Sequence, residues 1–228
     1  LITSRKKAVH TITHELRTPL TVIGGNAELL LNDTEADNRM RHAQTIGDAA
    51  GRMAGMINNL LVYFRLDSGK ETPSVKPFKL RSIAETLETE FATLAKNKGL
   101  NFKTASETDE IVSGDRNRII SIGGNLLSNA IKFTRSGTVT LSTGYKNGIF
   151  TLTVEDTGTG MTGEQQARIF IPFERLGNAV TEDGFGLGLA IVADTVKLLK
   201  GNITVESEPG IGTLVSIRFP LNKAIRAE

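Results

Sequence analysis

The stretch His14-Glu15-Leu16-Arg17-Thr18-Pro19-Leu20 gathers an imidazole, a carboxylate, a guanidinium and a hydroxyl within five residues. It lies early in a long segment in which apolar or small residues recur in steps of four and three. These residues are Ile12, Leu16, Pro19, Ile23 and Leu30, and Asn26 interrupts one step. This pattern predicts a helix over residues 1 to about 31. Because His14 lies between two seam positions, its side chain is expected to face outward.

A lone outward histidine is most often an ordinary surface residue. A zinc-protease helix would need H-E-x-x-H, but position 18 is Thr18. His10 shares a helical face with His14, yet two exposed histidines in a chain without cysteine make a poor zinc site. The acidic neighbour Glu15 and the proline that follows favour a chemical role for His14.

A second helix is predicted over residues 38 to about 67. Its apolar seam steps by 4, 3, 4, 3 and 4 through Ile46, Ala50, Met53, Ile57, Leu60 and Phe64. Two antiparallel helices cannot bury two such seams alone, so we expect a homodimer that forms a four-helix bundle. Glycines recur every four residues on this helix, at Gly47, Gly51 and Gly55, and indicate either chance or a bare surface beside His14.

The domain boundary is predicted at the polar stretch Asp67 to Ser74, which contains a glycine and a proline. We therefore expect two domains, at 1–68 and 77–222, with a linker at 69–76 and a tail at 223–228. After the linker, an amphipathic helix is predicted over residues 81–98, and Asp115 is the predicted N-cap of a helix that runs to about Phe133. Two alternating strands, Thr138–Tyr145 and Gly148–Glu155, are predicted to form a hairpin around Lys146 and Asn147. The expected fold is multidomain: an all-α two-helix hairpin, then an α+β sandwich with helices on one face of a mixed sheet.

Composition excludes several classes of protein. The 228 residues carry a formal charge of +2, which is too weak to indicate nucleic-acid binding. The absence of cysteine excludes a disulfide framework. No apolar run approaches the roughly 18–20 residues of a membrane span. Because the chain starts at Leu1 in what reads as helix, we expect it to be a fragment.

Four clusters in the second part of the chain carry chemistry. Asn125, Asn129 and Lys132 share one helical face. Their two amide oxygens and one cation suit a hard metal ion and phosphate. The alternative is that they form an ordinary solvated polar face. Asp156-Thr157-Gly158-Thr159-Gly160-Met161 places a carboxylate at a strand end, where it suits the exocyclic amine of adenine. Phe170 to Arg175 combines apolar anchors with a cation. Gly184-Phe185-Gly186-Leu187-Gly188-Leu189 opens into a helix, whose first N–H groups can bind phosphate.

Each cluster is weak by itself. The glycine run is no Rossmann fingerprint, because position 189 is Leu189, and no P-loop, because no G-K-[ST] follows. The triplet at Asp156 matches an aspartic protease, but such enzymes pair two carboxylates. Together and in this order, behind the histidine stretch, the clusters resemble the asparagine box, two glycine boxes and phenylalanine box of bacterial two-component sensor histidine kinases. That ATP-binding fold is shared with gyrase-type, Hsp90-type and MutL-type ATPases.

The resemblance implies that residues 1–68 are a dimerisation and histidine phosphotransfer domain and that residues 77–222 are a catalytic ATP-binding domain. It also implies a role for each matching position. His14 is the phosphoacceptor, Glu15 its base, Thr18 a residue for phosphatase activity, and Arg175 approaches the γ-phosphate. Asn125 and Asn129 are expected to serve Mg²⁺. The expected ATP-binding residues are Asn125, Asn129, Lys132, Phe133, Asp156, Gly158, Gly160, Met161, Phe173, Gly184, Gly186, Leu187, Gly188 and Leu189.

The implied activity is autophosphorylation of a histidine from ATP, followed by transfer to an aspartate of a response regulator receiver domain. Phosphatase activity on that regulator is also expected. The resemblance implies the cytoplasmic portion of an inner-membrane sensor, attached only through a segment absent from this chain. The alternative is an ATPase of the same superfamily that uses nucleotide as a conformational clamp, without histidine phosphotransfer.

Overall fold

The computed structural model describes residues 2–106, 108–174 and 186–224, with side chains described from Thr11 onward. The chain divides into two compact units. One contains Leu1–Arg65 with Ile171–Gly188, and the other contains Leu66–Phe170 with Leu189–Glu228. Each unit is described by itself.

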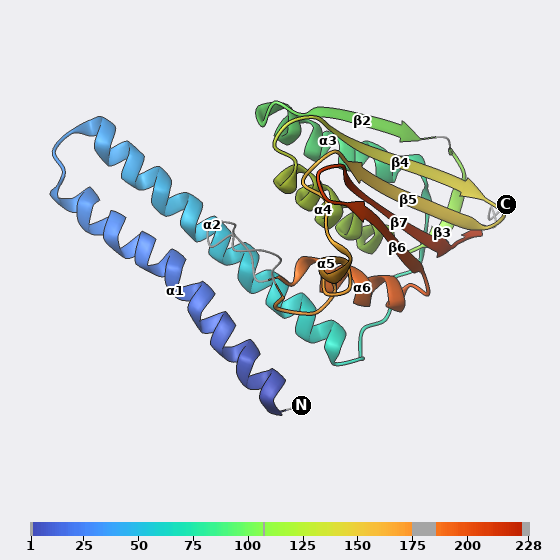
Figure 1. Cartoon of the computed structure of the whole chain (residues 1–228), viewed down its shortest axis with the longest axis horizontal. Helices are drawn as coiled ribbons and strands as arrows, with labels where there is room; N and C mark the ends of the chain where they lie inside the picture. Colours follow the sequence, from blue (N-terminus) through green and yellow to red (C-terminus); the bar gives the residue numbers. More distant parts are fainter. Residues whose placement is uncertain (1, 107, 175–185, 225–228) are drawn as a thin grey trace. The chain divides into compact units, whose positions relative to one another are not determined.

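The helical hairpin consists of α1 (Ile2–Asn32) and α2 (Ala36–Asp67). The two helices run side by side in opposite directions (Figure 1). The connection between them is short, and Asp33 Oδ1 accepts a hydrogen bond from the Glu35 N–H at 3.0 Å. His42 of α2 adds a contact across the hairpin, with its Nδ1 2.9 Å from Asn26 Oδ1. Local polar contacts therefore fix the turn.

The apolar seam predicted for the second helix is divided between two faces in the structure. Leu60 is buried, together with Ala49 and Met56, which the predicted seam did not include. Ile57 and Phe64 of that seam remain 42% and 53% exposed. The seam was wrong in detail: the buried residues Ala49 and Met56 each lie one position before the predicted Ala50 and Ile57. The hairpin thus keeps an exposed apolar face.

The second unit is built on two sheets. The larger has five strands in the order β2-β4-β5-β7-β6, and the smaller has three in the order β1-β3-β8. β2 pairs with β4 in parallel, whereas all other neighbours are antiparallel. The strands are β1 (Lys76–Lys79), β2 (Asn101–Ser106), β3 (Ile111–Gly114), β4 (Thr138–Lys146), β5 (Ile149–Asp156), β6 (Asn202–Glu208), β7 (Gly212–Pro220) and β8 (Asn222–Lys223).

Helices cover one face of the larger sheet (Figure 1). They are α3 (Arg81–Asn97), α4 (Arg116–Phe133), the single-turn α5 (Gly163–Gln166) and α6 (Gly188–Leu198). Side chains along β4 and β5 point alternately to the two faces of the sheet. Leu141, Phe150 and Leu152 therefore lie in the core, where each is fully buried. α3 and α4 pack closely at Gly123, where a Cβ would lie 2.5 Å from Leu87 Cδ1.

The predicted fold class, a helical hairpin followed by an α+β unit with a mixed sheet, is confirmed. α5 and β8 were not predicted, because four and two residues are too short to show periodicity. Among the described residues, no helix has the length and hydropathy needed to cross a membrane.

Candidate functional site

The histidine stretch lies within α1. His14 and Thr18 are exposed and one turn apart, so they share a face of the helix, while Glu15 is half-buried. Pro19 is buried and has no N–H to donate to the carbonyl of Glu15 one turn earlier. The helix nevertheless continues through it. An exposed imidazole can be reached by another domain.

α4 begins at a side-chain cap, as predicted. Asp115 Oδ1 accepts a hydrogen bond from the Arg118 N–H at 3.1 Å and satisfies one of the unpaired donors of the first turn. Arg116 fixes the same turn to α3, because its guanidinium donates to the carbonyl oxygen of Ser82 and to Thr86 Oγ1. These contacts orient the helix that carries the asparagine cluster.

The polar stripe of α4 carries Asn125, Asn129 and Lys132. Asn125 Nδ2 donates to the carbonyl oxygen of Ser121 at 2.9 Å. Its amide nitrogen is used within the helix, so Oδ1 is left as an acceptor for a cation. Lys132 Nζ stands 5.1 Å from the ring centroid of Phe133, which places positive charge at the end of the stripe.

The C-terminal turn of α4 is held by three separate segments. Helix ends leave four carbonyl groups without intrahelical donors. Here Thr134 N–H donates to Ala130, Lys98 Nζ to Ile131 and Lys132, and Thr159 N–H to Phe133. The donor–acceptor distances are 3.1, 2.5, 2.8 and 3.3 Å in that order. The last of these bonds joins α4 to the loop that follows Asp156.

Asp156 ends β5 and is half-buried. Burial raises the pKa of its carboxyl above the ordinary value, and hydrogen bonds from the backbone of Gly158 and Thr213 oppose that rise. The Gly158 N–H donates to Asp156 Oδ1 at 2.8 Å. These bonds orient a carboxylate that still has acceptor capacity for a ligand.

The two glycines of this loop are required by space and by backbone conformation. A Cβ at Gly158 would lie 2.6 Å from the carbonyl oxygen of Phe133. Gly160 has φ +61°, and a Cβ there would lie 1.8 Å from the carbonyl oxygen of Glu208. Met161 follows, half-buried, and its carbonyl oxygen accepts from Gln166 Nε2 at 3.2 Å.

α5 begins directly after this loop. Thr162 and Gln165 form a reciprocal capping box at its start. The T-x-x-Q spacing is a sequence signature that would have identified this helix.

The phenylalanine and second glycine clusters belong to the unit that contains the hairpin. Phe173 has φ +64°, an uncommon conformation for a bulky residue, and its N–H donates to the carbonyl oxygen of Gly186 at 3.2 Å. Its ring meets the Tyr63 ring edge-on, with centroids 5.8 Å apart. Gly186 has φ +68°, with the Glu174 carbonyl oxygen 2.4 Å from where a Cβ would stand.

Leu187 is buried, Gly188 begins α6, and Leu189 is half-buried. Arg175, Gly184 and the segment 176–183 lie outside the described residues. Among the described residues there is no group of three or more histidine, aspartate or glutamate side chains that could hold a metal ion. A magnesium site would therefore rest on amide oxygens and on the phosphates of the nucleotide.

The structure brings the asparagine cluster and the Asp156 loop together in one unit, through the bond from Thr159 to Phe133. It also adds a residue that sequence reasoning missed, Lys98, which lies 33 and 34 positions from the carbonyl groups that it caps. No sequence periodicity connects such distant positions.

Comparison with known proteins gives two family matches. Residues 4–69 match the His Kinase A (phospho-acceptor) domain. Residues 114–223 match the histidine kinase-, DNA gyrase B- and HSP90-like ATPase family.

Two curated relatives extend the similarity over almost the whole chain. The sensor histidine kinase RcsC of Escherichia coli (strain K12) is 32% identical over 222 residues, which cover 96% of this chain and 23% of RcsC. The autoinducer 2 sensor kinase/phosphatase LuxQ of Vibrio cholerae is 32% identical over 225 residues, 95% of this chain and 26% of LuxQ. The chain thus spans about a quarter of these relatives.

A solved structure shows the same fold. Full-length ShkA in complex with AMPPNP is 28% identical, with a TM-score of 0.74, over 96% of this chain and 46% of ShkA. With the two family matches, this similarity covers both units of the chain. The chain belongs to the sensor histidine kinases and carries their catalytic core, a phosphoacceptor domain followed by an ATP-binding domain.

Proposed function

We propose that this chain binds ATP in its second unit and phosphorylates His14. The observation that carries the proposal is the junction at the end of α4. There the half-buried carboxylate of Asp156 and the polar stripe of Asn125, Asn129 and Lys132 belong to one hydrogen-bonded framework. A carboxylate acceptor suits the amino group of adenine, and the stripe suits the charges of a triphosphate.

Each residue of the proposed site has a role in that reaction. Asn125 and Asn129 would hold Mg²⁺, because their amide oxygens are hard donors and the Asn125 nitrogen is already bonded within the helix. When bound, Mg²⁺ neutralises charge on the phosphates. Lys132, and Arg175 outside the described residues, would add positive charge as the γ-phosphoryl passes through a loose transition state.

At the acceptor, an imidazole nitrogen of His14 attacks the γ-phosphorus of ATP in line; the new P–N bond forms as the bond from that phosphorus to the ADP oxygen breaks, and ADP leaves. Glu15 orients the ring and takes its proton. Since adjacent helical residues point in different directions, the long glutamate side chain has to fold back. Phe133, Gly158, Gly160 and Met161 shape the nucleotide pocket within the second unit.

The phosphoryl group then moves to an aspartate of a response regulator receiver domain. The relative LuxQ is named a sensor kinase/phosphatase, and Thr18, one turn from His14, would help water attack the aspartyl phosphate of the regulator, which releases inorganic phosphate and restores the aspartate. The exposed apolar face of α2 supports a homodimer through the hairpin. We place the chain, with domains at 1–68 and 77–222, in the cytoplasmic portion of an inner-membrane sensor.

Labelling with ATP that carries a γ-phosphate tracer tests the proposal. Wild type should gain one acid-labile, base-stable label, and His14→Ala should gain none. His10→Ala, one turn earlier in the sequence, is the matched control and should label like wild type. Equal labelling of wild type and His14→Ala would favour an ATPase that uses nucleotide only as a conformational clamp.

A further inference from the structure

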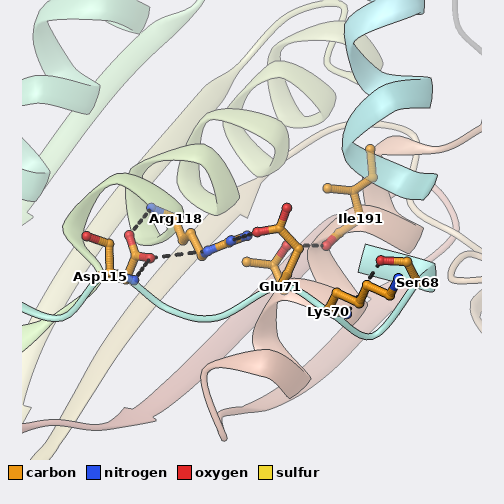
Figure 2. Close-up of polar contacts among 8 residues, drawn as sticks. Ser68, Lys70, Glu71, Asp115, Arg118 and Ile191 are labelled. Carbon is orange, nitrogen blue, oxygen red and sulfur yellow. Dashed lines mark hydrogen bonds and ion pairs between the residues drawn. The ribbon is translucent and has the colours of Figure 1, made fainter. Parts of the chain in front are cut away.

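The segment between the end of α2 and the start of β1 is held against α4 by four residues, Glu71, Ser74, Asp115 and Arg118, which we call the linker clamp. Arg118 Nη2 meets Glu71 Oε2 at 2.5 Å, and Arg118 Nε meets Asp115 Oδ2 at 3.2 Å. The Ser74 N–H donates to Asp115 Oδ2 at 2.8 Å. Figure 2 shows Glu71, Arg118 and Asp115 in one line, with Arg118 between the two carboxylates.

Asp115 is the centre of the linker clamp. It is only 5% exposed, and both of its oxygens are used. Oδ1 caps α4 at the Arg118 N–H, and Oδ2 accepts from Ser74 and from the Arg118 guanidinium. The linker supplies one of these donors, the Ser74 N–H, and removing it costs free energy because Oδ2 is buried away from water.

The Glu71–Arg118 pair is itself partly shielded from water. The side chains of Arg118 and Glu71 are 22% and 29% exposed. An ion pair that is partly buried and shares a network is less screened by salt than an isolated surface pair. The two residues are 47 positions apart in the sequence, so this ion pair is a tertiary contact and not part of a local turn.

Anchoring at Glu71 leaves little chain between the two parts of the molecule. α2 ends at Asp67, and Gly69 turns the chain with φ +66°. Four Cα steps separate Asp67 from Glu71, which span at most about 14 Å. If the linker clamp opened, the next anchor would be Lys76, paired with Gly114 in β1 and β3. Nine steps separate Asp67 from Lys76, which span about 30 Å.

We propose that the linker clamp shortens the tether of the ATP-binding unit and thereby positions bound ATP for phosphoryl transfer to His14. Glu71, Ser74, Asp115 and Arg118 are positioning residues for the kinase reaction, and the inference rests on the proposed function. The effective concentration of a tethered group falls with about the −3/2 power of tether length, so a change from four to nine steps lowers it about threefold. This holds for a target His14 on the same protomer or on its partner.

The test opens the linker clamp without touching nucleotide-binding residues or the α4 cap. Glu71→Ala removes the ion pair, and Ser74→Pro removes the N–H that binds Asp115. The double variant should autophosphorylate about threefold more slowly than wild type at saturating ATP, and Glu71→Ala alone about twofold, since Ser74 then still anchors the linker seven steps from Asp67. Affinity for a fluorescent ATP analogue should not change. Glu88→Ala, an exposed acid on α3 outside the linker clamp, is the matched control and should match wild type in every assay.

Hydrogen exchange supplies a readout that does not depend on activity. The Ser74 amide should be protected in wild type and in Glu88→Ala, and should exchange faster in Glu71→Ala, which loses the ion pair. If this protection is lost but the rate of Glu71→Ala at saturating ATP equals that of wild type or rises, the positioning role is wrong. If the Ser74 amide exchanges equally fast in wild type and in Glu71→Ala, the linker clamp itself is wrong. If wild type gains no label on His14, the proposed function fails instead, and the exchange result still decides whether the linker clamp forms.

Discussion

Replacing Gly158 by alanine probes how the Asp156 loop is fixed to α4. The added Cβ would stand 2.6 Å from the carbonyl oxygen of Phe133 and 2.7 Å from Asp156 Oδ1, whereas ordinary contact begins near 3.4 Å. The loop must therefore retreat from α4 by about 0.8 Å, the difference between 3.4 and 2.6 Å. Neither obstacle is the free end of a flexible side chain, since one is backbone and the other is a carboxylate held by hydrogen bonds.

That displacement acts on two hydrogen bonds at once. The bond from Thr159 to Phe133 is already 3.3 Å long, and the bond from Gly158 to Asp156 is 2.8 Å long. Overpacking costs about 1–3 kcal/mol, and a retreat of the loop that relieves it instead weakens the two hydrogen bonds, at about 1 kcal/mol each. We expect the free energy of unfolding to fall by about 2 kcal/mol, which for a unit of this size lowers Tm by roughly 4–8 °C.

Nucleotide binding should fall in parallel, because Asp156 loses its orientation. A hydrogen bond to a charged group contributes about 1.5–3 kcal/mol, so affinity for a fluorescent ATP analogue should weaken at least about tenfold. Calorimetry and titration measure the two effects. Gly163→Ala is the matched control: nothing lies within 4 Å of its added Cβ, and Gly163 begins α5. If Gly158→Ala and Gly163→Ala give the same Tm and affinity, the packing argument is refuted.

Three further predictions concern other parts of the chain. Lys98→Met removes both hydrogen bonds to the end of α4 and should lower stability in urea by about 1 kcal/mol, whereas Lys96→Met on the exposed side of α3 should have no such effect. Burial raises the pKa of the Asp156 carboxyl. The contribution of Asp156 to folding stability is therefore present at acid pH and is lost as the pH rises through the folded-state pKa. Binding of adenine, in contrast, needs the ionised carboxylate of Asp156 as an acceptor. ATP affinity should therefore weaken as the pH falls through the raised pKa of Asp156, and this additional loss should be absent from Asp156→Asn, whose affinity should be weak throughout; parallel pH profiles for the two proteins would contradict this. Leu61→Glu, at a side chain 51% exposed on α2, should weaken the homodimer at least about a hundredfold in sedimentation by burying an unpaired charge, whereas Leu94→Glu, 53% exposed on α3, should leave it intact. Wild type that is monomeric at micromolar concentration would contradict the dimer.

Features set by local sequence were predicted correctly, and those set by distant contacts were not. Asp115 was identified as an N-cap because its type and its place before an apolar-periodic run suffice for that inference. The β4–β5 hairpin follows from alternation on either side of Lys146 and Asn147. The exposed position of His14 follows from helical phase. Each of these depends on neighbours within a few residues.

Contacts between distant residues carry no such signal. Glu71 and Arg118 lie 47 positions apart, and in the sequence each resembles an ordinary solvated charge. Lys98 was likewise read only as part of the end of a helix. Periodicity assigned Ile57 and Phe64 to one seam, but both stay exposed in the protomer while Ala49 and Met56 are buried. The residue roles taken from the histidine kinase resemblance, Thr18 and Arg175 among them, stay predictions.

The position of β7 in the sheet has a consequence for how the protein is made. β7 is formed by residues 212–220, yet it lies between β5 and β6 in the larger sheet. A nascent chain that has been synthesised only as far as β6 has no place to pair that strand, and the side of β5 that β7 will occupy stays open. Unpaired strand edges invite association with other chains. We therefore expect the ATP-binding unit to complete its sheet late in translation, and products that stop before residue 212 to aggregate rather than persist as partly active kinases.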